Sequence, residues 1–345
     1  MLSAFAESLA FKAASCSILV LERPCVRVRV FFHDKCFDGA AAAAVFSRFY
    51  RERIRANVEF QFTGLVHRAG RLFDESQFDG DENAIVDFKY SASPKIAWWF
   101  DHHESAFLTA EDAEDYERSQ SNKKFYDPDF TSCTKFVATI AEQRFGFDCR
   151  PLAELIEWAD IIDGALYPDA KTAVEIAQPA MKLTMVIETA PHPDFVPRLI
   201  ELLTFTPLQE VVEVPWVAER IPALLERHRQ SIEILRSRTR CSDGTIFFDI
   251  TDQELEGYNK FIPYYLNPAC TYSVGLSKSS FRTKVAVGSN PWAPAPPTVN
   301  LAKICERYGG GGHARVGAIS FEPHQTERAR QAAAEIVAEL RRAGK

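Results

Sequence analysis

The stretch from Cys25 to Arg53 places the tightest constraint on the fold of this chain. It begins with CVRVRVFFH, in which valines alternate with arginines before the segment becomes fully apolar, and this pattern predicts a strand. The turn-like sequence HDKCFDG follows, and Gly39 then opens AAAAAVFSRFYRER, a run of strong helix formers. A strand that passes directly into a helix is the start of an α/β unit, so we expect helices packed on a sheet.

The remainder of the first half continues this alternation. Further strands are expected at Val58–Phe62, Ala84–Phe88 and Ile96–Phe100. Helices are expected at Cys133–Arg144, with Thr131 or Ser132 as the N-cap, and at Leu152–Ala159. Strands that alternate with helices indicate a parallel sheet covered on both faces.

The second half of the chain has a different character. Little strand signal is found between Lys171 and Arg240, where apolar residues at helical spacing predict one long amphipathic helix through Val217, Ile221, Leu224, Leu225, Ile232 and Leu235. Strands return at Gly244–Ile250, Thr271–Leu276, Phe281–Gly288 and Val316–Phe321, with a short helix near Val299–Arg307 and a surface loop at Asn290–Pro297.

These elements predict an α/β protein of two domains, because 345 residues are too many for one typical core. We expect a parallel-sheet N-terminal catalytic domain at 1–205, a helical connector at 206–241 and a smaller mixed α/β C-terminal domain at 242–345. Residues 1–24 are expected to be an extension rather than a signal peptide, because they lack a basic segment followed by a clean apolar core.

Composition excludes several function classes. The net charge is −7, so no global field attracts the protein to DNA or to an acidic membrane. No apolar run is long enough to span a bilayer. The eight cysteines include no Cys-x-x-Cys pair, so neither a disulfide framework nor a zinc knuckle is indicated, and we expect a reducing, cytoplasmic location.

Acidic and imidazole groups collect where the predicted strands of the first half end. They are His33, Cys36 and Asp38 after the first strand, Asp87 after the third, and Asp101, His102 and His103 after the fourth. Each group alone could be a helix cap or a turn residue. Because three strand ends share this feature, and ligands bind at the carboxyl ends of strands in an open α/β sheet, the joint pattern predicts one pocket. Carboxylates with imidazoles suit a pair of divalent first-row metals, Mn²⁺ in particular.

The chain resembles the DHH phosphoesterases. The tripeptide itself stands at Asp101–His103 in WWFDHHESA, and HDKCFDG, IVDFKY and WADIID match three other motifs of that family in the expected order. The glycine run GGGGH at Gly309–His313 looks like the motif of the DHH-associated C-terminal domain. The resemblance extends from about Val26 to Phe321, and five motifs in order make it specific.

The resemblance implies a two-metal site. His33 and Cys36 would hold one ion, and Asp38, His102 and one acid of WADIID, either Asp160 or Asp163, would hold the other. We favour Asp160 slightly because it is expected to end the helix. Asp87 would bridge both ions, His103 would face the substrate phosphate, and Asp101, if not a ligand, would orient His102.

The site departs from the family pattern at Cys36, where many members carry aspartate. A thiolate is softer than a carboxylate, so another divalent metal could replace Mn²⁺ at that position. Two such metals would activate water and clamp the oxygens of an in-line displacement at phosphorus.

The second domain carries its own candidate residues. Glycines let backbone N–H groups approach a phosphate closely, and His313 can donate a hydrogen bond to it, so we expect Gly310, Gly311, Gly312 and His313 to bind substrate. Arg315, Arg282 and Lys284 support this interpretation, because arginine pairs bidentately with phosphate. The alternative is a glycine-rich loop without a ligand.

Other residues are weaker candidates. His67 and Arg68 are expected on a surface loop rather than in the cleft, and Trp98 and Trp99 in a buried strand. Tyr308 or Trp292 could stack a nucleobase, whereas Phe281 is expected in the core.

We therefore predict a metal-dependent phosphoesterase that hydrolyses short oligonucleotides, dinucleotides or nucleotide monophosphate esters. No extended basic groove for a long nucleic acid is visible in the sequence, no membrane is expected as a partner, and a homodimer is compatible with it. The competing hypotheses are an exopolyphosphatase, a non-catalytic nucleotide sensor that keeps the fold, and an all-helical HD-type phosphohydrolase, which the strand before His33 disfavours.

Overall fold

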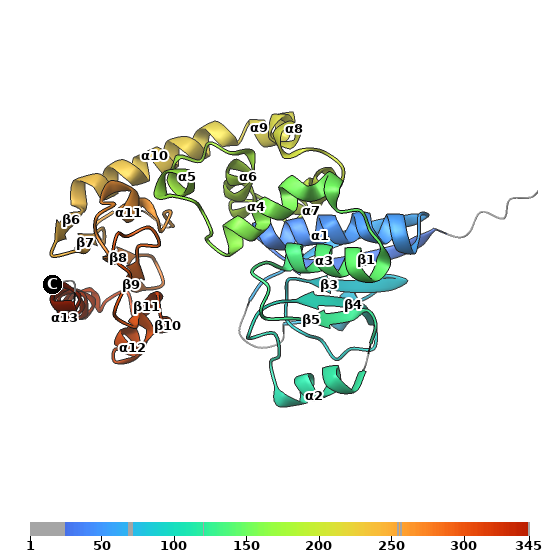
Figure 1. Ribbon diagram of the computed structural model, residues 1–345, viewed down its shortest axis with the longest axis horizontal. Helices are drawn as coiled ribbons and strands as arrows, with labels where there is room; N and C mark the ends of the chain where they lie inside the picture. Colours follow the sequence, from blue (N-terminus) through green and yellow to red (C-terminus); the bar gives the residue numbers. More distant parts are fainter. Residues whose placement is uncertain (1–24, 68–71, 120, 254, 256, 344–345) are drawn as a thin grey trace, which may run out of the picture.

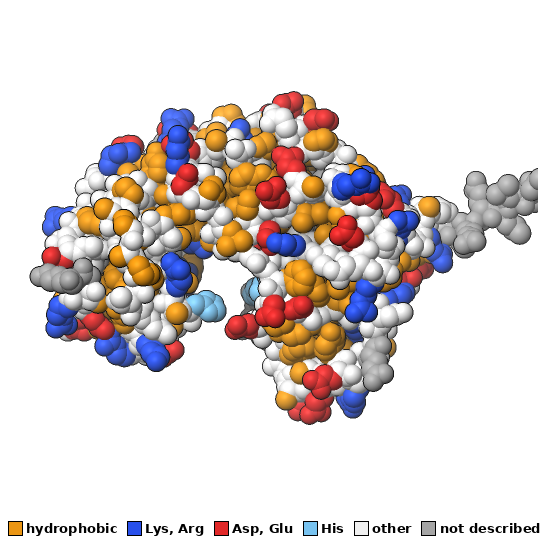
Figure 2. Space-filling model, in the orientation of Figure 1, with side chains coloured by type: hydrophobic (Ala, Val, Ile, Leu, Met, Phe, Trp, Pro, Cys, Tyr) orange, Lys and Arg blue, Asp and Glu red, His pale blue; other side chains and the backbone are white. Residues whose placement is uncertain are grey.

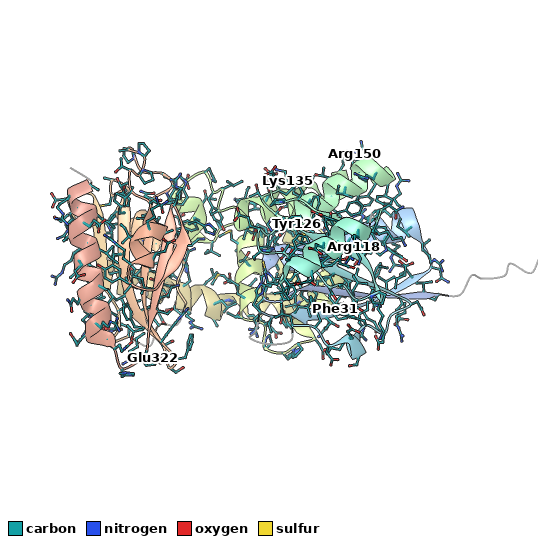
Figure 3. The ribbon with its side chains drawn as sticks, turned by 90° about the horizontal axis from the view of Figure 1, so that it is seen from below. Phe31, Arg118, Tyr126, Lys135, Arg150 and Glu322 are labelled. Carbon is teal, nitrogen blue, oxygen red and sulfur yellow. A yellow bond between two sulfur atoms is a disulfide. The ribbon has the colours of Figure 1, made fainter. Side chains whose placement is uncertain are left out.

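A computed structural model describes residues 25–67, 72–119, 121–253, 255 and 257–343. The predicted extension at 1–24 lies outside these residues. The described chain forms two lobes, each built on its own sheet, and helices connect them along one side (Figure 1). Seen from below, the sheet that ends near Glu322 and the sheet that ends near Tyr126 lie at opposite ends of the molecule (Figure 3).

The first sheet has five strands in the order β2-β1-β3-β4-β5, and all its neighbours are parallel. The strands are β1 (Val26–His33), β2 (Val58–Leu65), β3 (Glu82–Val86), β4 (Ile96–Asp101) and β5 (Lys124–Tyr126). This confirms the predicted parallel sheet. The short β5 was not predicted.

Both faces of this sheet are covered, as expected. On one face α1 (Phe37–Phe49), whose alanines are fully buried, packs beside α3 (Cys133–Phe145), α4 (Ala153–Asp163) and α7 (Phe195–Leu203). A helix of small residues can lie close to its neighbours, which explains the run of alanines. On the other face Phe31, Ile85 and Trp99 form a separate core with Tyr116 of α2 (Ala110–Ser119).

The middle of the chain is helical, as predicted. It contains α5 (Ala170–Glu175), α6 (Pro179–Glu188), α8 (Leu208–Glu213), α9 (Pro215–Ala218) and α10 (Ile221–Arg238). The single amphipathic helix expected from Val217 to Leu235 is therefore two helices. Pro222 lies in the first turn of α10, where its missing N–H is tolerated, so this residue favours a new helix start after the break.

The second sheet has six strands in the order β10-β11-β9-β8-β7-β6. They are β6 (Arg240–Ser242), β7 (Thr245–Asp249), β8 (Tyr272–Lys278), β9 (Thr283–Ser289), β10 (Gly311–His313) and β11 (Val316–Phe321). Only β7 and β8 pair in parallel, so the sheet is mixed, as predicted.

Helices pack on both sides of the second sheet. Two of them, α12 (Leu301–Glu306) and α13 (Thr326–Ala343), share one core with β8, β9 and β11. A second core joins β7 and α11 (Ile262–Leu266) to α5, α6 and α10. Helix α10 spans much of the predicted connector and reaches the start of the second sheet (Figure 1). The domain limits of 1–205, 206–241 and 242–345 remain predictions.

Two further observations concern the sequence expectations. A disulfide joins Cys241 of β6 to Cys270, contrary to the expectation that the cysteines form none. The two residues are 29 positions apart and show no recognisable spacing, so the sequence did not reveal the pair. Among the described helices, none is long and apolar enough to cross a membrane.

Candidate metal centre

Three neighbouring strands bring the predicted ligands to one edge of the first sheet. The register places Phe32 of β1 beside Val86 of β3, and Val86 beside Phe100 of β4, so the residues that follow these strands emerge side by side. Three groups of ligand atoms result, with the atoms of each group within 4.8 Å of one another. They are His33 with Cys36 and Asp87, Asp87 with His102 and His103, and Asp38 with His102 and Asp163.

Asp87 lies at the centre of this cluster. It is 2% exposed, and its backbone has a φ of +57°, a left-handed conformation that aspartate adopts more readily than most residues. Its Oδ2 is 3.4 Å from His33 Nδ1, and its Oδ1 is 3.5 Å from His102 Nε2. All four of these buried atoms lack a hydrogen-bond partner with good geometry in the described chain. Buried polar atoms are normally satisfied, so this donor set fits divalent metal ions.

Asp38 is fixed by the start of helix α3. Its carboxylate accepts hydrogen bonds from the backbone N–H groups of Cys133 at 2.7 Å and Thr134 at 2.9 Å. The N-terminus of a helix stabilises an anion through such groups and through its dipole. Ser132 caps the same helix by accepting from the Lys135 N–H, which resolves the alternative between Thr131 and Ser132.

The ring of His102 is oriented by a main-chain carbonyl. Its Nδ1–H donates to the Phe130 carbonyl at 2.9 Å, which leaves Nε2 directed at the acids. This nitrogen lies 3.8 Å from Asp38 Oδ2 and 3.6 Å from Asp163 Oδ2. A fixed tautomer with Nε2 free is the usual arrangement of a histidine ligand.

The geometry reverses the slight preference for Asp160 over Asp163. Helix α4 continues to Asp163, so Asp160 does not end it, and the two side chains point to different neighbours. Asp160 forms a salt bridge of 2.6 Å with Lys135 and accepts a hydrogen bond from Ser132, away from the cluster. Asp163 faces His102 and joins the group of Asp38.

Asp101 orients His103 rather than His102. Its Oδ1 accepts from His103 Nδ1–H at 2.7 Å and from the backbone N–H groups of both histidines. Asp101 is fully buried, whereas the side chain of His103 is 39% exposed. The contact therefore presents Nε2 of His103 to the open side of the site.

Burial and neighbouring charges act in opposite directions on the pKa values of the acids and histidines in this site. Burial opposes ionisation of Asp87, but the close imidazoles of His102 and His33 outweigh it and lower the pKa of Asp87 to about 2. Burial also opposes a charged His102, yet the nearby carboxylates of Asp87 and Asp38 raise the pKa of His102 to about 10. For Asp38 and Asp163, burial and then the charge of Asp87 raise the pKa. Such concentrated shifts are typical of functional sites.

Cys36 sits at the N-cap of α1 and contributes its sulfur to the group of His33 and Asp87. Burial, followed by the charges of Asp87 and Asp38, raises the pKa of its thiol. Without a cation the sulfur is therefore a thiol, and a metal ion at this position would be needed to deprotonate it.

The second lobe faces this centre across a hollow. Figure 2 shows the hollow between the lobes, with histidine side chains on both of its walls. Strand β10, which carries Gly311, Gly312 and His313, lies on the side of the second lobe towards the first (Figure 1). Its residues are exposed, and so is Arg315 in the turn to β11.

Solved structures provide the comparison, because neither a family model nor a curated protein matches this chain. The pGpG-specific phosphodiesterase PggH from Vibrio cholerae has a TM-score of 0.64 at 17% identity, and the match covers 92% of this chain and 99% of PggH. The DHH domain of a member of a family of ribosomal proteins has a TM-score of 0.59 at 14% identity, with 90% of this chain and 86% of that domain covered. This chain has the DHH phosphoesterase fold.

The DHH fold explains why distant motifs converge. The tripeptide Asp101–His103 lies at the end of β4. Asp87 follows the adjacent strand β3, and His33 ends β1, the next strand towards β2. Asp163 comes from α4, which packs on α1 and α3, so its position depends on helix packing that the sequence pattern does not reveal.

Other sequence expectations have mixed outcomes. Trp98 and Trp99 are fully buried, as predicted, but Phe281 is 66% exposed at the tip between β8 and β9 and not in the core. His67 stacks on Phe88 with 4.7 Å between ring centroids and lies 5.0 Å from the ring of His33, so it borders the centre. Its neighbour Arg68 lies outside the described residues. The sequence signal for His67 was its place just after β2, the neighbour of β1.

Proposed function

We propose that this chain is a metal-dependent phosphoesterase that hydrolyses short nucleotide phosphate esters. The observation that carries this proposal is Asp87, a buried carboxylate whose two oxygens lack hydrogen bonds among the described residues and face imidazole nitrogens. A buried, ionised carboxylate requires compensating charge, and two cations on either side would provide it.

The two ions would share Asp87. His33 and Cys36 would hold one ion with Asp87, and Asp38, His102 and Asp163 would hold the other with Asp87 as the bridging ligand. When bound, the ions would supply Lewis acidity and neutralise charge on the phosphate under attack. Imidazole with carboxylate suits Mn²⁺, whereas the sulfur of Cys36 would favour a softer ion such as Zn²⁺ or Fe²⁺ at its position.

His103 and Asp101 would act on the substrate itself. The hydrogen bond to Asp101, helped by its charge, raises the pKa of His103 despite partial burial. A protonated His103 held by Asp101 would donate from Nε2 to an oxygen of the scissile phosphate and stabilise the charge that develops there.

The second lobe would bind the remainder of the ester. His313 and Arg315 are exposed near the turn between β10 and β11, beside the C-terminal end of β9. Arg282 directly precedes the N-terminal end of β9 and donates a hydrogen bond to Ser320. Burial and the neighbouring Arg282 lower the pKa of Lys284, which indicates that the two cations lie close together. Cations at both ends of one strand suit a ligand of nucleotide or dinucleotide size better than inorganic phosphate.

Two observations favour a short substrate. The net charge of −7 disfavours the extended basic groove that a long strand requires. PggH, which shares this fold across nearly its whole length, is a pGpG-specific phosphodiesterase. An exopolyphosphatase would use the same centre, and a nucleotide sensor would keep the second lobe without turnover.

One experiment separates these functions. The purified full chain is incubated with Mn²⁺ and, in turn, with dinucleotides, short oligonucleotides, 3′-phosphoadenosine 5′-phosphate and polyphosphate, and the products are followed by chromatography. We expect metal-dependent cleavage of dinucleotides or short oligonucleotides, and Asp87→Asn should reduce it by orders of magnitude while the fold persists. Cleavage of polyphosphate alone would indicate an exopolyphosphatase. Metal-loaded protein without turnover would indicate a sensor.

Cys36 provides a second test of the metal assignment. Cys36→Ala should lower the metal content, and Cys36→Asp should stay active with a stronger preference for Mn²⁺. Cys149→Ala is the matched control, because Cys149 is a partly buried thiol whose S–H donates to the Ala138 carbonyl outside the cluster. Unchanged metal content and turnover in Cys36→Ala would show that Cys36 only fills space.

A further inference from the structure

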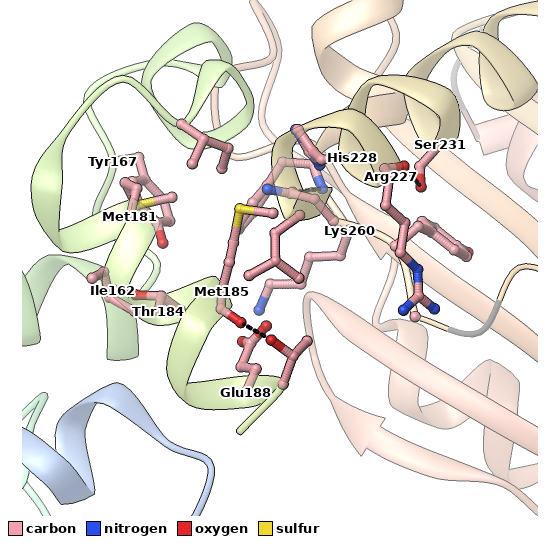
Figure 4. A pocket seen from close by; sticks show the side chains of 17 residues that line it. Ile162, Tyr167, Met181, Thr184, Met185, Glu188, Arg227, His228, Ser231 and Lys260 are labelled. Atoms are coloured by element: carbon pink, nitrogen blue, oxygen red, sulfur yellow. Dashed lines mark hydrogen bonds between the residues drawn. The ribbon is translucent and has the colours of Figure 1, made fainter. Parts of the chain in front are cut away.

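A cavity lies between helices α6 and α10 and residues 257–261, and none of the candidate metal ligands lines it. Its volume is about 560 Å³, within the roughly 300–1,000 Å³ typical of small-molecule sites. Figure 4 shows Met181, Met185 and Glu188 of α6 on one wall and Arg227 and His228 of α10 on the opposite side. We refer to it as the α6–α10 cavity.

This cavity adjoins the candidate ligands. Ile162, which lines it, directly precedes Asp163 at the end of α4. Tyr167 also lines it, and burial, followed by the charges of Glu188 and Asp163, raises the pKa of Tyr167. Ile162 and Tyr167 thus place the cavity wall on either side of Asp163 in the chain. A ligand in the cavity could therefore belong to the same molecule as a phosphate at the centre.

Glu188 is the unusual group in the cavity. Its side chain is exposed towards the cavity, and its carboxylate has no hydrogen-bond or ion-pair partner among the described residues. The surrounding cavity wall partly desolvates the carboxylate and raises its pKa. An ionised carboxylate accepts hydrogen bonds and cannot donate them. A ligand that offers N–H donors to Glu188 would replace water at the carboxylate and stabilise its ionised form.

The rest of the lining suits a flat, partly apolar group joined to an anion. Met181 and Met185 offer polarisable surfaces that pack well against aromatic rings, and Tyr258 and Phe261 add aromatic area. The positive charges come from Arg227 and Lys260. Aromatic and thioether surfaces with cations nearby are the usual means of holding a nucleobase and its phosphate.

We propose that the α6–α10 cavity binds a guanine base of the substrate, with Glu188 accepting hydrogen bonds from the base edge. Guanine presents two adjacent donors, N1–H and the 2-amino group, which match the two oxygens of one carboxylate. Adenine presents a single amino group beside a ring nitrogen that accepts, so the same carboxylate would repel its edge. This inference rests on the proposed function, because it takes the base to be part of the ester held at the metal centre.

The test measures the dissociation constants of guanosine, inosine and adenosine 5′-monophosphates. Each nucleotide is titrated into the full chain without added metal and followed by calorimetry. Inosine keeps N1–H but lacks the 2-amino group, so affinity should fall from guanosine to inosine to adenosine. Glu188→Gln should reduce the preference for guanosine over adenosine by roughly tenfold or more, because hydrogen bonds to a charged group are lost. Glu201→Gln on α7 is the matched control, an exposed glutamate outside the lining, and should leave the preference unchanged.

The outcomes separate this inference from the proposed function. Hydrolysis by the wild type is measured in parallel with bis(p-nitrophenyl) phosphate and Mn²⁺, an ester that carries no base. Cleavage of this ester together with equal affinity for guanosine and adenosine monophosphates would overturn the inference and leave the phosphoesterase standing. An unchanged preference in a folded Glu188→Gln variant would also overturn it. Guanosine preference with no cleavage of any ester would instead reject the proposed function.

Discussion

Asp87 occupies a backbone conformation that costs free energy for most residues other than glycine. Its φ of +57° and its burial occur together with two carboxylate oxygens that lack hydrogen bonds among the described residues. Strain of this kind, on the order of 1–3 kcal/mol, persists where the surroundings fix the residue, and it is frequent at functional sites. Asparagine tolerates the same conformation, so Asp87→Asn tests the charge of the side chain and leaves the backbone preference unchanged.

The two aspartates of α4 allow a matched comparison. We expect Asp163→Asn to lower the metal content, because Asp163 faces His102 and Asp38, and to reduce turnover with it. Asp160→Asn should keep the metals, since it removes only a salt bridge with the half-exposed Lys135, a contact worth about 1 kcal/mol or less. Elemental analysis of both purified variants is the measurement. Equal metal loss in both would return Asp160 to the ligand set.

Metal binding should also depend on pH. In the metal-free protein the pKa of His102 is raised to about 10, so its ring is protonated near neutral pH. A metal ion requires the neutral Nε2, so binding must release this proton, and affinity should rise with pH. Each released proton makes the dissociation constant fall about tenfold per pH unit below the pKa. Mn²⁺ titrations from roughly pH 6.5 to 8.5 measure this effect. Affinity that does not change with pH would contradict the assignment of His102.

At the scale of elements, the glycines before and within β10 differ in how much space a side chain would have. A Cβ on Gly310 would lie 2.3 Å from the Ala318 carbonyl oxygen, and one on Gly312 would lie 2.2 Å from that of Val316. Gly312 also has a φ of +151°. These two glycines let β10 pair closely with β11. Gly311, whose Cβ would meet nothing within 4 Å, is not needed for this packing.

This difference gives a prediction for strand β10. Gly310→Ala and Gly312→Ala should lower the melting temperature, because a clash with backbone must be relieved by moving the strand. Gly311→Ala should melt like the wild type, yet it should bind substrate more weakly if a phosphate approaches this backbone closely. Thermal melting and KM are measured for all three variants. A lowered melting temperature for Gly311→Ala would mean that the whole run is structural.

The elements that were predicted are those whose residues carry a strong local pattern. Strands β1, β3 and β4 are apolar and end in polar groups, so their ends indicated the site. The three-residue β5 and helix α13 were missed. Strand β5 is short, and alanines, which have little hydrophobic contrast with their neighbours, make up half of the buried face of α13. Phe281 was misjudged because it lies at an exposed hairpin tip. The choice between Asp160 and Asp163 stayed open because it depends on how α4 packs against the sheet, which the local sequence pattern does not reveal.

At the scale of the whole molecule, two lobes face each other across a hollow, and the proposed function uses both (Figure 2). The net charge of −7 works against any polyanion at long range, so attraction must come from local cations and metals. If the second lobe binds substrate and the first holds the metals, as proposed, kinetic measurements can separate the two roles. Changes in the second lobe should alter substrate capture without altering the metals.

His313 provides this test. It is exposed on β10, in the wall that faces the metal lobe, so His313→Ala should raise KM while the metal content and kcat stay close to wild type. A hydrogen bond to a charged phosphate contributes roughly 1.5–3 kcal/mol, which corresponds to about a ten- to hundredfold increase in KM. His324→Ala is the matched control, since His324 is an exposed histidine beyond the opposite end of β11 and should change neither constant. Loss of metal in His313→Ala would place this strand in the metal centre, and an unchanged KM would remove it from the substrate site.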